Sequence, residues 1–431
     1  MAVLINGTTG IDKVQDDSVD IADLSATGSP SSSTYLRGDN SWATAGGATS
    51  INGLSDGNTT GTDNVGLGTN VWGSGSYSGT YNTAVGKAAM YATTSGQRNV
   101  AMGREALYTN TTGSYNVGIG MNAMNQNTTG NNNIAVGYDT LLSNTTGVRN
   151  TAVGYQALTA NTTAGYNSAF GYLTLGANTT GAENTAYGAE ALSSNTTGSR
   201  NVAVGYNAMR VNTTSSDNTA IGDQALELNT AGTNNVAVGR RALENSTTGY
   251  ANTAVGTSAL TGNTTGVRST AVGFEAGDNT STASDNISIG YQARPSSSSV
   301  SDQCTLGNSA ITDLRCNDTS ISSLSDSRDK TNIVDIPLGL SFINTVRPVS
   351  FDWNRRDGSM AGKKDFGFIA QELKTVADAT DYADHMRLVH DDNPDKLEAD
   401  PMKMFPILVK AIQELSEQNT ALAARITTLE G

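Results

Sequence analysis

The hexapeptide S-D-S-R-D-K at residues 325–330 contains the residue types of a nucleophilic site, a serine and a lysine five positions apart. A serine hydroxyl becomes a nucleophile when a neighbouring base takes its proton, and a neutral lysine can be that base in place of histidine. Burial favours the neutral form of lysine. A polar hexapeptide with this spacing is, by itself, more typical of a solvated loop. The residues around Ser325 and Lys330 must therefore decide between the two interpretations.

Histidine and cysteine offer the other reactive side chains. His385 and His390 lie in D-H-M-R-L-V-H-D-D, which we interpret as a solvated His–Asp cluster rather than a metal site. Cys304 and Cys316 lie 12 residues apart, match no metal pattern and are too few for a disulfide framework. We expect two small buried thiols near a fibre axis rather than a disulfide. The sequence thus predicts no metal and no cofactor.

The composition excludes several classes of function. Of 431 residues 47 are glycine, and only 15% are charged, which is low for a globular enzyme. The net charge of −14 disfavours nucleic-acid binding, which needs a basic face. The start of the chain, M-A-V-L-I-N-G-T-T-G-I-D-K-V, lacks the basic and apolar regions of a signal peptide, and no stretch is long enough to cross a membrane. We expect no export signal and no membrane insertion.

A 17-residue repeat occupies about half of the chain. Its consensus is N-T-A-V-G-x-x-A-L-x-x-N-T-T-G-x-x, and it runs from Asn82 to Gly290, with a looser copy one residue out of phase at residues 64–68. A fixed period of this kind indicates stacked units that bury a face only against their neighbours. The first position of the unit recurs at Asn82, Asn99, Asn116, Asn133, Asn150, Asn167, Asn184, Asn201, Asn218, Asn235, Asn252, Ser269 and Asn286.

Each unit predicts one rung of a parallel β-solenoid. Positions two to four alternate in β-forming residues, so they predict a short strand, and N-T-T-G predicts a turn. We expect no helix between residues 82 and 290. The repeated Asn and Thr side chains predict hydrogen-bonded ladders along the stack. The second and fourth positions share one face of the strand, and the alanine between them faces the other way. We expect the fourth positions to form one buried column, which contains Val85, Met102, Ile119, Val136 and Val153.

The N-T-A-V-G motif resembles the head repeat of trimeric autotransporter adhesins, whose unit carries an S-V-A-I-G core. The resemblance implies a left-handed β-roll in which three chains pack side by side, although the unit here is longer. An autotransporter also needs an export signal and a membrane anchor. A bacterial trimeric adhesin is therefore an alternative rather than our preferred interpretation.

Changes of composition predict five segments. Residues 1–60 form an N-terminal segment, in which S-P-S-S-S-T-Y-L-R-G-D-N-S-W resembles a short module of phage tail-fibre proteins or is a plain Ser/Gly-rich linker. Its triplet Arg37-Gly38-Asp39 indicates a turn rather than an integrin motif. Residues 61–294 form the solenoid shaft or head, and 295–324 a neck of further β-rungs. The last two segments are residues 325–404 and 405–431.

Residues 325–404 predict a small α+β domain, with a helix at 338–346, a strand at 349–353 and a helix at 369–376. Residues 405–431 predict a helix with an a/d heptad seam, which we interpret as a coiled coil joining identical chains. The polar Asn419 in this seam is typical of residues that set register. The seam consists of Phe405, Leu408, Ile412, Leu415, Asn419, Leu422, Ile426 and Leu429.

The segment from Ser325 onward resembles the endosialidase-type C-terminal intramolecular chaperone of phage tailspikes and tail fibres. The matching stretches are S-D-S-R-D-K, V-S-F-D-W, G-F-I-A-Q-E-L and A-I-Q-E-L. The resemblance implies that Ser325 and Lys330 form a self-cleaving dyad and that the chain is cut between Leu324 and Ser325. Any enzymatic activity would then be autoproteolysis, without an external substrate.

Together these features predict a mostly β protein, a homotrimeric phage tail fibre made in the host cytoplasm and carried on the virion. Its N-terminus would bind phage tail proteins, and the fibre would bind a host cell-surface glycan or protein. The alternative is a tailspike glycan hydrolase or lyase, which needs paired carboxylates in a groove. An assay on host capsule would discriminate, since the repeat carries only scattered acids. These include Glu105, Glu183, Glu190 and Glu227.

Overall fold

The computed structural model covers the whole chain and describes residues 34–36, 42–44, 63–73, 77–311, 315, 325–355, 361–393, 395 and 397–431. Most of the N-terminal segment 1–60, with Arg37-Gly38-Asp39, lies outside the described residues, as do Cys316, Leu324 and most of the neck beyond residue 311. Within the N-terminal segment, β1 (Thr34–Leu36) pairs antiparallel with β2 (Trp42–Thr44). Contacts divide the chain into two compact units, residues 1–183 and 184–431.

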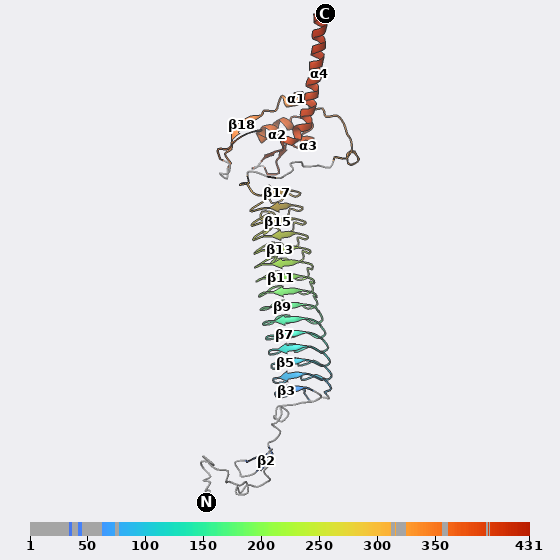
Figure 1. Cartoon of the computed structure of the whole chain (residues 1–431), viewed down its shortest axis with the longest axis vertical. Helices are drawn as coiled ribbons and strands as arrows, with labels where there is room; N and C mark the ends of the chain where they lie inside the picture. Colours follow the sequence, from blue (N-terminus) through green and yellow to red (C-terminus); the bar gives the residue numbers. More distant parts are fainter. Residues whose placement is uncertain are drawn as a thin grey trace. The chain divides into compact units, whose positions relative to one another are not determined.

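Short parallel strands, one for each repeat, build a β-solenoid in both units, and within each unit every strand pairs with the next one along the chain (Figure 1). Val136 lies opposite Val153, its equivalent 17 residues later. No helix occurs among the described residues between 82 and 290. The mostly β fold and the 17-residue rung are thus confirmed, whereas the hand of the roll stays a prediction.

The strands of the first unit are β3 (Val65–Leu67), β4 (Thr83–Val85), β5 (Val100–Met102), β6 (Val117–Ile119), β7 (Ile134–Val136), β8 (Thr151–Val153) and β9 (Ser168–Phe170). Those of the second are β10 (Thr185–Tyr187), β11 (Val202–Val204), β12 (Thr219–Ile221), β13 (Val236–Val238), β14 (Thr253–Val255), β15 (Thr270–Val272), β16 (Ile287–Ile289) and β17 (Cys304–Leu306). The last strand carries the solenoid into the predicted neck.

The buried face of the strands is the opposite of the one we expected. The fourth positions do stack in one column, but they face outward: Met102 is 43% exposed and Ile119 37%. The column of Val85, Met102, Ile119, Val136 and Val153 is therefore not buried, and that prediction is wrong.

The residues that fill the interior explain why. In the rung of β8, Ala152 from the strand and the pair Ala157 and Leu158 from the turn are all fully buried. A rung of 17 residues encloses a narrow space, which these side chains fill without the larger fourth-position residue.

Two buried asparagine columns run along the interior. In the first, Asn150 donates its backbone N–H to Asn133 Oδ1 at 2.9 Å and its side-chain amide to the Ala164 carbonyl at 2.8 Å. In the second, Asn144 Nδ2 donates to Asn127 Oδ1 at 2.8 Å. These bonds satisfy polar groups that would otherwise be costly to bury. Threonine hydroxyls add a third ladder by donating to the carbonyl of the equivalent residue in the next rung, as at Thr94, Thr111, Thr128, Thr145, Thr162, Thr196, Thr230 and Thr247. The predicted ladders are confirmed.

The glycine after each strand has a backbone that only glycine adopts easily. Gly137 has φ of +136°, and a Cβ added there would lie 2.2 Å from the Gly154 carbonyl oxygen of the next rung. The fifth position of the repeat is therefore glycine because successive turns stack backbone on backbone.

The C-terminal part of the second unit is a small α+β region, as predicted. Two antiparallel hairpins pair β18 with β19 and β20 with β21. Its elements are η3 (Ser327–Asp329), α1 (Leu340–Ile343), β18 (Val349–Asp352), β19 (Lys364–Gly367), α2 (Ala370–Asp378), α3 (Ala383–Met386), β20 (Val389–His390), β21 (Glu398–Ala399), η4 (Pro401–Met404) and α4 (Phe405–Glu430). Its core consists of Phe342, Leu373, Ala377, Met386, Leu388, Met404 and Ile407.

The long helix α4 packs on this core only at its beginning. It buries Ile407 and Ala411, and Glu414 accepts a hydrogen bond of 2.7 Å from the backbone N–H of Leu340 at the start of α1. The predicted heptad seam lies on another side of the helix and is exposed, with Ile412 at 67% and Leu422 at 53%. The seam is thus unpartnered in the single chain, and the coiled coil stays a prediction.

Candidate catalytic site

A tight turn folds the hexapeptide 325–330 back on itself. The 3-10 helix η3 begins after Asp326, whose side chain accepts a hydrogen bond of 2.9 Å from the Arg328 backbone N–H. At the other end, Lys330 N–H donates to the Ser327 carbonyl at 3.3 Å. An aspartate that caps a helix start in this way stabilises the turn.

This turn brings Lys330 back to Ser325. Lys330 Nζ lies 2.6 Å from Ser325 Oγ and 3.3 Å from the Ser325 carbonyl oxygen. Both residues are exposed in the single chain. An ammonium group can only donate hydrogen bonds, so Lys330 must first lose a proton before it can take one from the serine.

An ion pair fixes the outer side of the turn. Arg328 Nε lies 3.0 Å from Asp326 Oδ1, and Arg328 Nη2 lies 2.5 Å from Asp326 Oδ2. The hydrogen bonds from Arg328 hold the pKa of the Asp326 carboxyl below its ordinary value, and the same carboxylate raises the pKa of Arg328. Sequence reasoning missed these two residues. The Asp at an N-cap position two residues before an Arg was the available signal.

Leu324, which precedes the proposed scissile bond, lies outside the described residues. The proposed cut between Leu324 and Ser325 therefore stays a prediction, and so do the catalytic roles of Ser325 and Lys330.

The other reactive side chains form no competing site. His385 and His390 are exposed, and His385 packs against the ring of Tyr382. Among the described residues, no group of three or more His, Cys, Asp or Glu side chains is placed to hold a metal ion. Cys304 is exposed in the single chain, so the expected burial of this thiol is wrong there. It occupies a second position of the repeat, which faces outward like the fourth.

Some of the acidic side chains of the solenoid form ion pairs. Glu105 pairs with Arg104 at 3.0 Å, and Glu227 pairs with Arg210 at 2.9 Å. Each of these two carboxylates is thus engaged by an arginine of the same chain.

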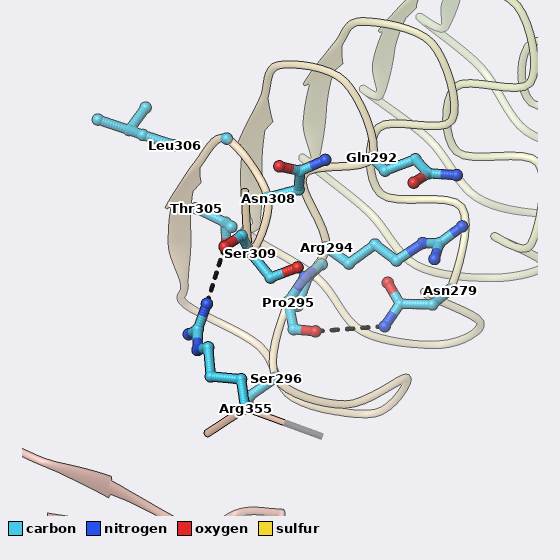
Figure 2. Close-up of a pocket in the computed structure, with 11 residues that line it drawn as sticks. Asn279, Gln292, Arg294, Pro295, Ser296, Thr305, Leu306, Asn308, Ser309 and Arg355 are labelled. Carbon is cyan, nitrogen blue, oxygen red and sulfur yellow. Dashed lines mark hydrogen bonds between the residues drawn. The ribbon is translucent and has the colours of Figure 1, made fainter. Parts of the chain in front are cut away.

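A polar cavity of about 470 Å³ lies at the last rungs of the second unit (Figure 2). Arg355 Nη1 donates to the Ser309 carbonyl at 2.8 Å, and Asn279 Nδ2 donates to the Pro295 carbonyl at 3.2 Å. Arg294 in its wall pairs with Asp278. The cavity contains no residue of the hexapeptide 325–330, and its cationic groups already have partners.

Among the described residues, no helix is both long and apolar enough to cross a bilayer.

No curated protein and no solved structure matches the chain. A family model does match one part of it: residues 325–385 match the family described as chaperone of endosialidase. The match starts at Ser325, the residue that Lys330 contacts, and it covers the small α+β region from η3 into α3. Residues 325–385 are therefore a chaperone-of-endosialidase domain, and together with the 17-residue solenoid they fit a tail fibre that ends in a C-terminal chaperone.

Proposed function

We propose that this chain forms a homotrimeric phage tail fibre whose C-terminal chaperone domain assembles three chains and then cuts itself off. The observation that carries the proposal is the position of the chaperone match. It begins at Ser325, directly after the solenoid and neck, and Lys330 Nζ lies 2.6 Å from the Ser325 hydroxyl.

The cleavage would follow the chemistry of serine nucleophiles. Neutral Lys330 takes the proton of Ser325 Oγ, and Oγ forms a bond to the carbonyl carbon of residue 324. The C–N bond then breaks, and Lys330 returns its proton to the departing amine. Water hydrolyses the resulting ester, which leaves a new carboxylate on residue 324 and a free hydroxyl on Ser325.

Assembly would control when this reaction starts. In the single chain Lys330 is exposed to water. Covering Lys330 by neighbouring chains would favour the neutral base that the reaction needs. The chain would therefore be cut only after the trimer has formed.

A C-terminal domain that joins three chains and is later removed suits a repetitive solenoid. Parallel sheets fold slowly, because their contacts join residues far apart in sequence, and identical rungs can pair out of register. The exposed seam of α4 offers the apolar residues by which three chains can be joined at their C-terminal ends.

The assembled fibre would be made in the host cytoplasm and carried on the virion. Its N-terminal segment would bind phage tail proteins, and its surface would bind a glycan or protein of the host cell.

Native mass spectrometry of the freshly expressed full chain tests the assembly. We expect three chains per particle, and a compact monomer would overturn the proposal. A pull-down of the fibre on whole cells of candidate hosts tests the binding role. The Ser325→Ala variant, which stays uncut, serves as the control for effects of the chaperone on binding.

A further inference from the structure

The last position of the repeat, directly before the first asparagine, carries cationic and aromatic side chains in the first unit. Over six successive rungs this position holds two arginines, three tyrosines and one asparagine, and no acid, although the chain has a net charge of −14. All six residues are exposed. We call this set the Arg–Tyr column, and it consists of Tyr81, Arg98, Tyr115, Asn132, Arg149 and Tyr166.

Stacking on tyrosine rings orients both guanidinium groups of the column. The guanidinium carbon of Arg98 lies 5.3 Å from the ring centroids of Tyr81 and Tyr115, and Arg98 Nη1 donates to the Tyr115 hydroxyl at 2.9 Å. Arg149 likewise lies 5.2 Å from the ring centroid of Tyr166 and donates to its hydroxyl. A guanidinium held by its faces presents its remaining N–H groups at its edge. Such a planar fork is suited to bind a carboxylate with two parallel hydrogen bonds.

The arginines at the same repeat position of the second unit already bind carboxylates in this way. Arg200 Nε lies 2.7 Å from Asp217 Oδ1, and Arg200 Nη2 lies 3.0 Å from Asp217 Oδ2. Arg268 makes the same two contacts with Asp285, both at 2.7 Å. In each case the next rung supplies the aspartate. This position of the repeat can therefore hold an arginine–carboxylate pair.

The Arg–Tyr column has the arginines of this arrangement without the acids. Among the residues that the structure describes, neither Arg98 nor Arg149 forms an ion pair with a carboxylate, since the next rungs supply Tyr115 and Tyr166 instead. The column thus offers two oriented cations that an acidic ligand can bind.

The surroundings of the two arginines indicate a sugar polymer. The rings of Tyr81, Tyr115 and Tyr166 are 52–53% exposed, and a tyrosine offers an apolar ring together with a polar hydroxyl, as the C–H and O–H groups of a sugar require. Arg98 and Arg149 are three rungs apart, or about 14 Å at a strand spacing of about 4.8 Å. A single small anion would contact one arginine, whereas a linear polymer with repeated carboxylates can contact both and gains avidity.

The charge of the chain argues against a nucleic acid at the same surface. Nucleic-acid binding needs a basic face that neutralises many phosphates. The Arg–Tyr column supplies two cations on a chain whose net charge is −14. A polymer with fewer charges and more hydroxyl groups matches this surface better.

We propose that the Arg–Tyr column binds an acidic polysaccharide of the host surface, with Arg98 and Arg149 each holding a sugar carboxylate and the tyrosines packing against sugar rings. The inference rests on the proposed host-binding role of the fibre, and it adds the site and the chemical class of the receptor.

Binding of the full-length trimer to immobilised polygalacturonate and alginate tests the ligand class, because every sugar of these two polymers carries a carboxylate. The matched control ligands are the same polymers after chemical reduction of their carboxyl groups to alcohols. We expect binding to at least one of the two acidic polymers, weaker as the salt concentration rises, and no binding to the reduced forms.

Two double variants test the site. Arg98→Gln with Arg149→Gln should weaken binding by roughly tenfold or more, because it removes charge-assisted hydrogen bonds. Arg200→Gln with Arg268→Gln removes the same net charge from the chain but leaves the column intact, so it should bind like the wild type. Native mass spectrometry of both variants checks that they remain trimers.

Several results would overturn the assignment. They are failure of the wild type to bind either acidic polymer, equal binding of the reduced polymers, preferred binding of single-stranded DNA, and wild-type affinity of the Arg98→Gln, Arg149→Gln variant. Loss of the trimer in that variant would place the column in assembly and overturn it as well. A fibre that binds host cells but neither polymer contradicts this inference alone, whereas a fibre that binds no cells contradicts the host-binding role.

Discussion

Lys330 Nζ lies 2.6 Å from Ser325 Oγ because the intervening turn reverses the chain. The contact is local, since both residues belong to one hexapeptide, and it does not depend on how the rest of the domain is arranged. Its geometry depends instead on Asp326, which caps the turn and pairs with Arg328.

Asp326 should therefore be a positioning residue for cleavage. We expect Asp326→Ala to slow autocleavage by about fivefold, because loss of one cap of this kind typically costs about 1 kcal/mol. Asp326→Asn keeps an oxygen that accepts the Arg328 N–H and should fall between Asp326→Ala and the wild type. Intact mass measured over a time course gives the rates, and a wild-type rate for Asp326→Ala would contradict the role.

The pH dependence of the same variants separates positioning from proton transfer. Arg328 lowers the pKa of Asp326, so the contribution of this carboxylate is complete above its ordinary pKa of about 4 and is lost as the pH falls through the lowered value. Between about pH 6 and 9 the Asp326 variants should keep the shape of the wild-type pH–rate profile and change only its height. A shifted profile would mean that Asp326 acts on the proton of Lys330.

The glycine after each strand should resist substitution. Gly137→Ala puts a Cβ 2.2 Å from the Gly154 carbonyl oxygen at a φ of +136°. We expect destabilisation of about 1–3 kcal/mol or more, measured as faster unfolding in denaturant. Thr146→Ala, at an exposed position, is the control and should unfold like the wild type.

Completing the second asparagine ladder should stabilise the solenoid. Ser246 occupies an asparagine position in the second ladder, and its buried Oγ has no hydrogen-bond partner. Ser246→Asn should restore the ladder between Asn229 and Asn263 and stabilise the solenoid by about 1 kcal/mol.

The reverse change, Asn144→Ser, is the matched control for that variant. It removes the 2.8 Å bonds of Asn144 to Asn127 and Asn161 and should destabilise by about 1–3 kcal/mol. Both substitutions are made in the Ser325→Ala background, which should keep the chain uncut. Their unfolding rates are then compared. Destabilisation by both variants would show that the ladder does not determine stability at Ser246.

The seam of α4 should control assembly. Ile412→Asp places a charge on a 67% exposed seam residue, and we expect loss of the trimer in native mass spectrometry. Ala424→Asp lies on the opposite side of the helix and should leave the trimer intact. If assembly switches on cleavage, Ile412→Asp should also remain uncut. A trimeric Ile412→Asp variant would contradict the coiled coil.

The repeat allowed most of the solenoid to be predicted, but not its buried face. The strict spacing of Asn and Gly predicted the rung, the parallel register and the ladders. The strand motif T-A-V has an apolar side chain on either face, so alternation alone cannot tell which one is inside. Because the fourth residue of the repeat is larger than the third, it was expected to fill the core. The interior is instead narrow enough for Ala152 and Leu158 to fill it.

The site was predicted only in part. Ser325 and Lys330 came from the resemblance to the chaperone family, because the spacing of a serine and a lysine does not itself indicate a turn that joins them. The cap at Asp326 and its pair with Arg328 depend on local backbone geometry, which a pattern of residue types does not specify. The predicted burial of Cys304 was wrong for the single chain. Like the fourth-position residues, Cys304 lies on the strand face that points outward.

Intact-mass spectrometry of freshly expressed wild-type protein tests the central claim most directly. We predict pieces of 324 and 431 − 324 = 107 residues, and an uncut chain for Ser325→Ala, which lacks the attacking hydroxyl, and for Lys330→Ala, which lacks the base. Both variants should still be trimers, because assembly precedes the cut. A wild-type trimer that remains intact after long incubation would contradict autocleavage by Ser325 and Lys330.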